Sequence, residues 1–300
     1  LLLPVFLSDY GLKGIWMAFF HSISAFCNAG FDILGREGHL YPSIVGYADN
    51  ILVNGVIIGL IIIGGIGFLT WEDICEYKWK FKNYRMQSKL ILATTVCLII
   101  FPACFFFFAD FQYLPVKSRF LASVFQSVTP RTAGFNTVDI TMMTEASKVV
   151  MILLMLIGGS PGSTAGGMKT TTFAVLLLNA VATFKSQEHA GAFGRRIDDQ
   201  VIKNAASIAM LYFMMFLAGG IMISTAEGLP MLSSLFEAAS AMGTVGLTLG
   251  ITPSLHKISL YVLILLMYMG RVGGLTLIYA VFSGKNKANA RFPMEKVMIG

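Results

Sequence analysis

Long apolar segments separated by short polar connectors run along most of this chain. Apolar runs cover residues 51–69, 90–109, 205–225 and 258–282. A helix needs about 20 apolar residues to cross the hydrocarbon core of a bilayer, so these runs are long enough to span it. Other apolar stretches, beginning near residues 20, 125 and 236, are shorter and give way to small or polar residues. The pattern predicts an all-α integral membrane protein in which spanning helices alternate with shorter helices.

Composition supports a membrane protein. The chain has 300 residues, of which 56% are hydrophobic and only 13% are charged, whereas soluble domains carry about 25% charged residues. Its four cysteines lie far apart, without a CxxC pair or a histidine at metal-ligand spacing. We therefore expect Cys27, Cys75, Cys97 and Cys104 to be small buried apolar residues.

The basic residues are concentrated in three segments, 78–89, 185–203 and 285–296. Lys and Arg accumulate in cytoplasmic connectors of membrane proteins, so we expect these segments and the C-terminus to be cytoplasmic. The net positive charge is thus a signal of topology, and no nucleic-acid partner is expected. The first residues, LLLPVFL, do not resemble a signal peptide and read as the end of a helix whose start is missing.

Three segments of the chain resemble one another. They are FHSISAFCNAGFDI from Phe20, FQSVTPRTAGFNTV from Phe125 and FEAASAMGTVGLTLG from Phe236. Each begins as a half-helix too short to span and reaches a glycine followed by a bulky apolar residue. The sequence predicts repeated units of helix, re-entrant segment and helix, over residues 1–83, 84–196 and 197–300.

Non-helical backbone at membrane depth survives only where protein buries it or water reaches it, so recurring re-entrant segments suggest a shared pore. Glycine can adopt a positive φ and turn carbonyl groups towards an axis, where they replace the hydration shell of a cation. The negative C-terminal ends of the half-helices would stabilise that cation. Alternatively, the glycines are helix-packing positions. The predicted filter residues, acting through backbone carbonyls, are Cys27, Asn28, Ala29, Gly30, Thr132, Ala133, Gly134, Thr244, Val245 and Gly246.

A second unusual segment, IGGSPGSTAGGMKTTT at 157–172, interrupts an apolar helix with proline and five glycines. Three interpretations are open: a tolerated kink, an ion site of a secondary transporter built on a broken helix, and a flexible plug below the filter. Arg271 lies inside the last apolar run and should face a cavity, because a charge is costly in lipid. The segment's candidate residues are Gly158, Gly159, Ser160, Pro161, Gly162, Ser163, Thr164, Ala165, Gly166, Gly167 and Lys169.

Two further expectations concern polar residues near the half-helices. Arg131 would repel a cation if it pointed inward, so we expect it to turn away and pair with Glu237. We expect His21, Gln126 and Glu237, at matching positions, to pack between repeats. An intramembrane serine protease would need a base beside its serine, but the histidines are scattered and the repeated glycine segments would have no role, so we predict no catalytic residues.

The segments TPRTAGFNT, SAFCNAGFD and SAMGTVGLT resemble the selectivity loops of the Trk/Ktr/HKT superfamily of bacterial and plant potassium transporters. The ending RFPMEKVMIG is most similar to KtrB-type membrane subunits. The resemblance implies four pore repeats, about three of which are present here, the first and the start of the second being absent upstream of Leu1.

The same resemblance implies what the residues alone do not specify. The transported ion would be K⁺, with Na⁺ as a possible activator and no organic cofactor. Residues 158–169 would form a gate, with Arg271 beside it. The subunit would form a homodimer in the bacterial plasma membrane and dock on a cytosolic nucleotide-binding ring of the regulator-of-K⁺-conductance type. A Na⁺- or H⁺-coupled secondary transporter is the alternative.

Overall fold

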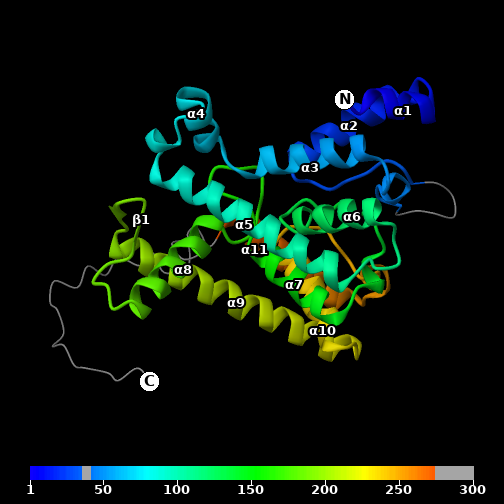
Figure 1. The fold of residues 1–300 in the computed structure, drawn as a ribbon. Helices are drawn as coiled ribbons and strands as arrows, with labels where there is room; N and C mark the ends of the chain where they lie inside the picture. The colour runs from blue at the N-terminus through cyan, green and yellow to red at the C-terminus, as the bar shows by residue number, and fades with distance from the viewer. Residues whose placement is uncertain (36–41, 274–300) are drawn as a thin grey trace.

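The computed structural model describes residues 1–35 and 42–273, which fold into consecutive helical units (Figure 1). The first unit contains α1 (Leu3–Tyr10), α2 (Lys13–Phe26), α3 (Ile51–Gly65) and α4 (Phe68–Tyr77). The second contains α5 (Met86–Ala109), α6 (Val116–Val128), α7 (Glu145–Leu156) and α8 (Thr170–Phe184), followed by the strands β1 (Gly191–Ala192) and β2 (Arg195–Arg196). The third contains α9 (Asp199–Glu227), α10 (Met231–Met242) and α11 (Lys257–Val272).

The three half-helices α2, α6 and α10 pack in the same way. Each contacts the helix that precedes it in the chain: α1, α5 and α9 respectively. The inner helix of one unit also contacts the half-helix of the next, α3 against α6 and α7 against α10. This repeated packing brings the ends of the half-helices together.

Local signals set several helix boundaries. The Asn50 side chain accepts hydrogen bonds from the backbone of Leu52 and Val53 and so caps α3. The Asp198 side chain caps α9 through the Gln200 N–H, and α9 ends at Glu227, before Gly228, which is left-handed with φ of 65°.

Two of the predicted spanning helices are confirmed. Within the described residues, α5 and α9 are long and apolar enough to cross a membrane. The expectation of one continuous helix over 51–69 is wrong, because α3 and α4 meet at a bend of 100°. Gly67, at the bend, has φ of 87°, outside the range of a helix. The last apolar run is helical to Val272, and residues from 274 onwards lie outside the described residues.

Large apolar side chains cover much of the surface, as in a protein surrounded by lipid. Phe101 and Phe108 on α5 are 71% and 72% exposed. The predicted burial of the cysteines is wrong, since all four are exposed and unpaired. In a bilayer the outer surface is itself apolar, so a small apolar side chain is as suitable there as in the core.

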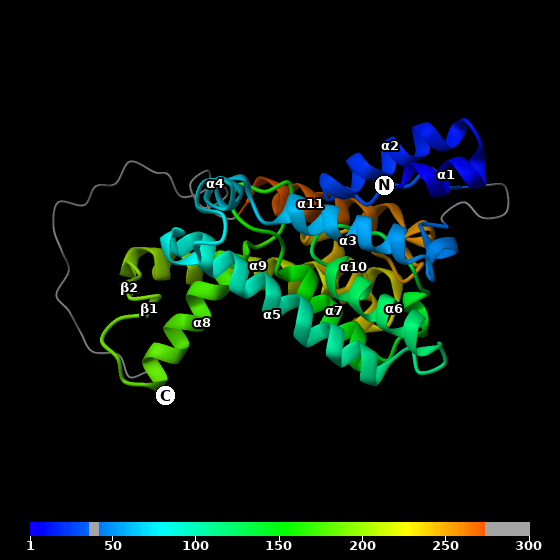
Figure 2. The same cartoon turned by 45° about the horizontal axis from the view of Figure 1, so that its top comes forward.

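Figures 1 and 2 both place α4 and the β1–β2 hairpin at one end of the molecule, with the α5–α6 connection at the other. The rings of Phe81, after α4, and Phe193, in the hairpin, are 6.3 Å apart and edge to face. The basic connectors 78–89 and 185–203 therefore lie at the same end. The third basic segment, 285–296, is outside the described residues.

Candidate ion-conduction site

The predicted filter residues follow directly on the ends of the half-helices. Residues 27–30 follow α2, while 132–134 and 244–246 follow within a few residues of α6 and α10. Gly30, Gly134 and Gly246 have φ values of 70°, 86° and 89°. All three lie in the left-handed region that side chains disfavour, so each position requires glycine for its backbone shape.

Neighbouring filter segments touch one another through backbone. A Cβ atom on Gly30 would lie 2.0 Å from the carbonyl oxygen of Ala133, and one on Gly134 would lie 2.1 Å from that of Val245. The Asn28 side chain also reaches the next segment, 3.3 Å from Thr132 Oγ1. The three segments thus stand side by side in chain order, with no space for a side chain at these two glycines.

Hydroxyl groups hold two of the segments in place. Ser24 Oγ donates to the carbonyl oxygen of Phe31 at 2.8 Å, and Thr129 Oγ1 donates to that of Phe135 at 2.6 Å. Each phenylalanine follows its filter glycine, so the two hydrogen bonds are equivalent. Sequence reasoning missed them, although a hydroxyl residue near the end of each half-helix was the available signal.

The expected pairing of Arg131 with Glu237 is wrong. Arg131 is 5% exposed, and its Nη2 donates to Thr95 Oγ1 on α5 at 3.3 Å. The Glu237 carboxylate instead accepts hydrogen bonds from Thr248 Oγ1 and Thr252 Oγ1, at 2.6 and 2.7 Å. Glu237 therefore braces the loop of its own repeat.

His21 and Gln126, at the matching positions of the other half-helices, differ from Glu237 and from each other. His21 is buried, bonds the Met17 carbonyl within its own helix, and stacks on Phe6 with ring centroids 5.3 Å apart. Both amide atoms of Gln126 are buried without a hydrogen-bond partner in the described structure. Matching sequence positions thus do not give matching contacts.

The segment 157–169 interrupts the α7–α8 helix and passes beside the filter. Thr164 Oγ1 donates to the carbonyl oxygen of Phe26, at the end of half-helix α2, at 3.1 Å. A Cβ on Gly166 would lie 2.0 Å from Oγ1 of the filter residue Thr244. This loop therefore contacts both the end of α2 and the segment that follows α10.

The same loop is joined to the break between α3 and α4. Ser160 N–H donates to Gly65 O at 3.0 Å, and Phe68 N–H donates to Gly162 O at 3.0 Å. Within the loop, Gly158 N–H bonds Met168 O at 2.8 Å. Non-helical backbone from two units thus satisfies its hydrogen bonds mutually, as burial in a membrane requires. The remaining candidates, Gly159, Pro161, Ser163 and Gly167, lie in the same turn-rich segment.

Two cationic side chains contact the loop. Arg271, in the last turn of α11, donates from Nη1 to Thr164 O at 2.8 Å. Lys169 Nζ donates to Ala165 O at 2.8 Å. Both positively charged side chains therefore adjoin the loop.

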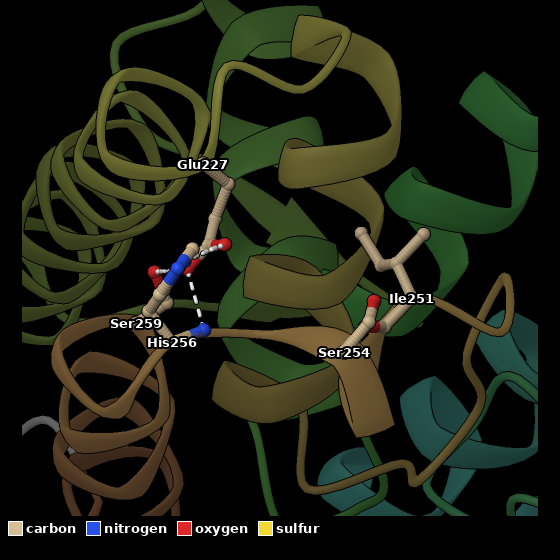
Figure 3. Close-up of polar contacts among 5 residues, drawn as sticks. All are labelled: Glu227, Ile251, Ser254, His256 and Ser259. Atoms are coloured by element: carbon tan, nitrogen blue, oxygen red, sulfur yellow. Dashed lines mark hydrogen bonds and ion pairs between the residues drawn. The ribbon is translucent and has the colours of Figure 1, made fainter.

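A polar cluster lies where α9 ends and α11 begins (Figure 3). The Glu227 carboxylate accepts from the backbone N–H of His256 at 2.9 Å, lies 2.7 Å from His256 Nδ1, and accepts from Ser259 Oγ. The serine and histidine both contact the glutamate, as Figure 3 shows, so the arrangement is a clip between two helices without the serine–histidine contact of a nucleophilic triad. It holds one end of the loop that follows the third filter segment.

The chain matches the model of the TrkH family, described as cation transport protein, over residues 5–288. It is 38% identical to the potassium/sodium uptake protein NtpJ of Enterococcus hirae, over 99% of this chain and 67% of that protein. It is 35% identical to the Ktr system potassium uptake protein B of Bacillus subtilis, over 97% of this chain and 65% of that protein. The chain spans about two thirds of the length of these relatives.

The fold is similar to the crystal structure of the potassium transporter TrkH from Vibrio parahaemolyticus. The TM-score is 0.74 at 21% sequence identity, covering 93% of this chain and 60% of that one. This similarity shows the fold, an all-α integral membrane architecture.

Proposed function

Because this chain belongs to the TrkH family of cation transport proteins, we propose that it takes up K⁺ through a channel-like pathway along the three filter segments. The observation that carries the proposal is the contact of these segments through backbone at Gly30 and Gly134. Three half-helices that end together at left-handed glycines form a site for a partly dehydrated cation. The family's members are transporters, and this chain is not an enzyme.

The proposed selectivity mechanism uses backbone carbonyls. The C-terminal ends of α2, α6 and α10 each carry a partial negative charge that favours a cation. The carbonyl groups must bind the ion strongly enough to replace its hydration shell, yet weakly enough to release it. The three segments contain different residues before their glycines, so their carbonyls form fewer matched rings than identical loops would form. We therefore expect only a modest preference for K⁺ over Na⁺. The name of the Enterococcus hirae relative includes both ions.

Residues 158–169 act as the gate in this proposal. The loop contacts Phe26 at the end of α2 and Thr244 after α10. Arg271 and Lys169 add positive charge beside the loop. A permeating cation meets both an obstruction and an electrostatic barrier. Conduction then requires the loop to move and carry these charges away from the ion's path.

The proposed assembly is a homodimer docked on a cytosolic nucleotide-binding ring. Three relatives are named as proteins of Ktr systems. The basic connector 185–203 with its hairpin lies at the end of the molecule that the positive-inside rule assigns to the cytoplasm, and it is the face we assign to the ring. Arg195→Gln with Arg196→Gln should weaken copurification of the ring, and an unchanged yield would contradict this assignment.

The test is K⁺ flux into liposomes with the full-chain protein and a fixed K⁺ gradient. Deleting residues 158–166 should give K⁺ flux in the absence of the cytosolic ring. In the protein without this deletion, Gly134→Ser should lower the preference for K⁺ over Na⁺. If neither change alters flux or preference, the pathway lies elsewhere.

Reversal potentials separate conduction from the alternative of Na⁺- or H⁺-coupled transport at the broken helix. Uncoupled conduction shifts the reversal potential with the permeant-ion gradient alone. Stoichiometric coupling makes it depend on the second ion in a fixed ratio, even when that ion does not permeate by itself. The second result would overturn the conduction proposal. Faster flux on adding Na⁺, at an unchanged reversal potential, would identify Na⁺ as an activator.

A further inference from the structure

Helix α4 turns sharply away from the direction of α3. It meets α3 at 100°, so when α3 crosses the bilayer, α4 runs nearly parallel to the bilayer plane. Figures 1 and 2 show α4 at the margin of the molecule, beyond the end of α3. The turn after it, which includes residues 81–83, leads into α5. We call residues 68–84 the surface segment.

Polar contacts, in which Asp73 is the buried partner, fix the orientation of the surface segment. Asp73 is fully buried and accepts from the backbone N–H of Arg85 at 2.9 Å. Glu72 forms an ion pair with Arg85 at 2.8 Å. Trp71 Nε1 donates to the Ile63 carbonyl at 2.9 Å, which satisfies an acceptor left by the helix break. Arg85 thus engages Glu72 and Asp73, while Glu76 is the one other acidic residue of the segment and is exposed.

The outward side of the surface segment combines apolar and basic side chains. Phe68 and Leu69 are 62% and 48% exposed, and Trp79 is 99% exposed. Trp79 belongs to the stretch YKWKFKNYR, in which basic and aromatic residues alternate. The exposed lysines are Lys78, Lys80 and Lys82, and none forms an ion pair within the part of the chain that the structure describes.

We propose that the surface segment lies on the cytoplasmic face of the membrane and binds anionic phospholipid headgroups through Lys78, Lys80 and Lys82, with Trp79 in the interfacial layer. Trp is favoured at the membrane interface because its ring is apolar and its N–H is polar. Lysines beside a membrane are attracted to anionic lipids. A lipid surface satisfies both features together, whereas water leaves the indole and the phenylalanine unburied.

The surface segment is connected to the loop 157–169. Phe68 N–H donates to Gly162 O at 3.0 Å, and a Cβ on Gly67 would lie 2.5 Å from Pro161 O. A shift of α4 on its lipid would therefore displace the loop. We infer that anionic lipid changes K⁺ flux through this contact, a part of the inference that rests on the proposed gating function.

The binding test uses the full-chain protein in nanodiscs of phosphatidylcholine, with or without phosphatidylglycerol. The variant Lys78→Gln, Lys80→Gln, Lys82→Gln is compared with Lys13→Gln, Lys117→Gln, Lys257→Gln, which removes equal charge from exposed lysines at the starts of α2, α6 and α11. Native mass spectrometry counts retained phosphatidylglycerol. We expect retention to fall at least about tenfold in the first variant and to stay near wild type in the second. Equal retention in both variants would overturn the lipid site.

Trp79 provides an independent measurement. Brominated phospholipids should quench a component of tryptophan fluorescence that is absent from Trp79→Phe, and unchanged quenching in that variant would place the indole away from lipid. If the lysine variant loses capture of the cytosolic ring but retains phosphatidylglycerol, the segment binds protein and the proposal is wrong.

Flux measurements separate the two parts of the inference. Lipid binding is counted without any transport assay, so it stands even if the protein carries no K⁺. If phosphatidylglycerol binds but flux is the same in both lipids, the coupling to the loop is overturned while the lipid site remains. If phosphatidylglycerol changes K⁺ flux in wild type and in the control variant but not in the Lys78, Lys80, Lys82 variant, both the lipid site and its coupling to the loop are supported.

Discussion

Gly134→Ala should damage ion selection without unfolding the protein. The residue has φ of +86°, and its new Cβ would lie 2.1 Å from the carbonyl oxygen of Val245, where ordinary contacts begin at 3.4 Å. The second and third filter segments must therefore separate by roughly 1 Å to restore normal contact. The left-handed backbone itself costs alanine about 1–2 kcal/mol. The clash meets backbone, which cannot rotate away as a side chain can.

We expect the K⁺/Na⁺ permeability ratio to fall at least about tenfold, which corresponds to about 1.4 kcal/mol of differential binding. Bi-ionic reversal potentials in proteoliposomes measure the ratio directly. Gly250→Ala is the matched control, because its φ is also +86° but no atom lies within 4 Å of the added Cβ. Both variants place alanine at the same φ, and only Gly134→Ala introduces the clash. A wild-type ratio in Gly134→Ala, or an equal loss in Gly250→Ala, would refute the packing argument.

Arg271→Gln should raise K⁺ flux several-fold in the same vesicles, because it removes a positive charge beside the loop and its bond to Thr164 O; unchanged flux would place the barrier elsewhere. Asn50→Ala should lower stability by about 1 kcal/mol, the usual value of a lost helix cap, seen as an earlier thermal transition. Glu227→Gln should also lower the melting temperature by weakening the clip to His256, and an unaltered transition would show that the clip contributes nothing.

The sequence predicted the features of this fold that depend on composition and repetition. Spanning helices α5 and α9 were recognisable from continuous apolarity, and the half-helices from their shared glycine ends. The break after α3 could not be recognised from the sequence pattern, because Gly67 lies inside an apolar run and hydropathy carries no information on φ. At this bend Phe68 N–H donates to the carbonyl oxygen of Gly162, nearly a hundred residues away in the chain.

Arg131 and Glu237 show where reasoning from residue types fails. The opposite charges of Arg131, just after α6, and Glu237, on α10, suggested an ion pair, but Glu237 accepts from Thr248 and Thr252 within its own repeat. Local hydroxyl donors require less chain ordering than a distant guanidinium, so they satisfy the carboxylate first. Arg131 remains buried and donates to Thr95 on α5. No Arg131–Glu237 pair therefore supports the proposed filter, whose negative charge we assign to the backbone at the C-terminal ends of the half-helices.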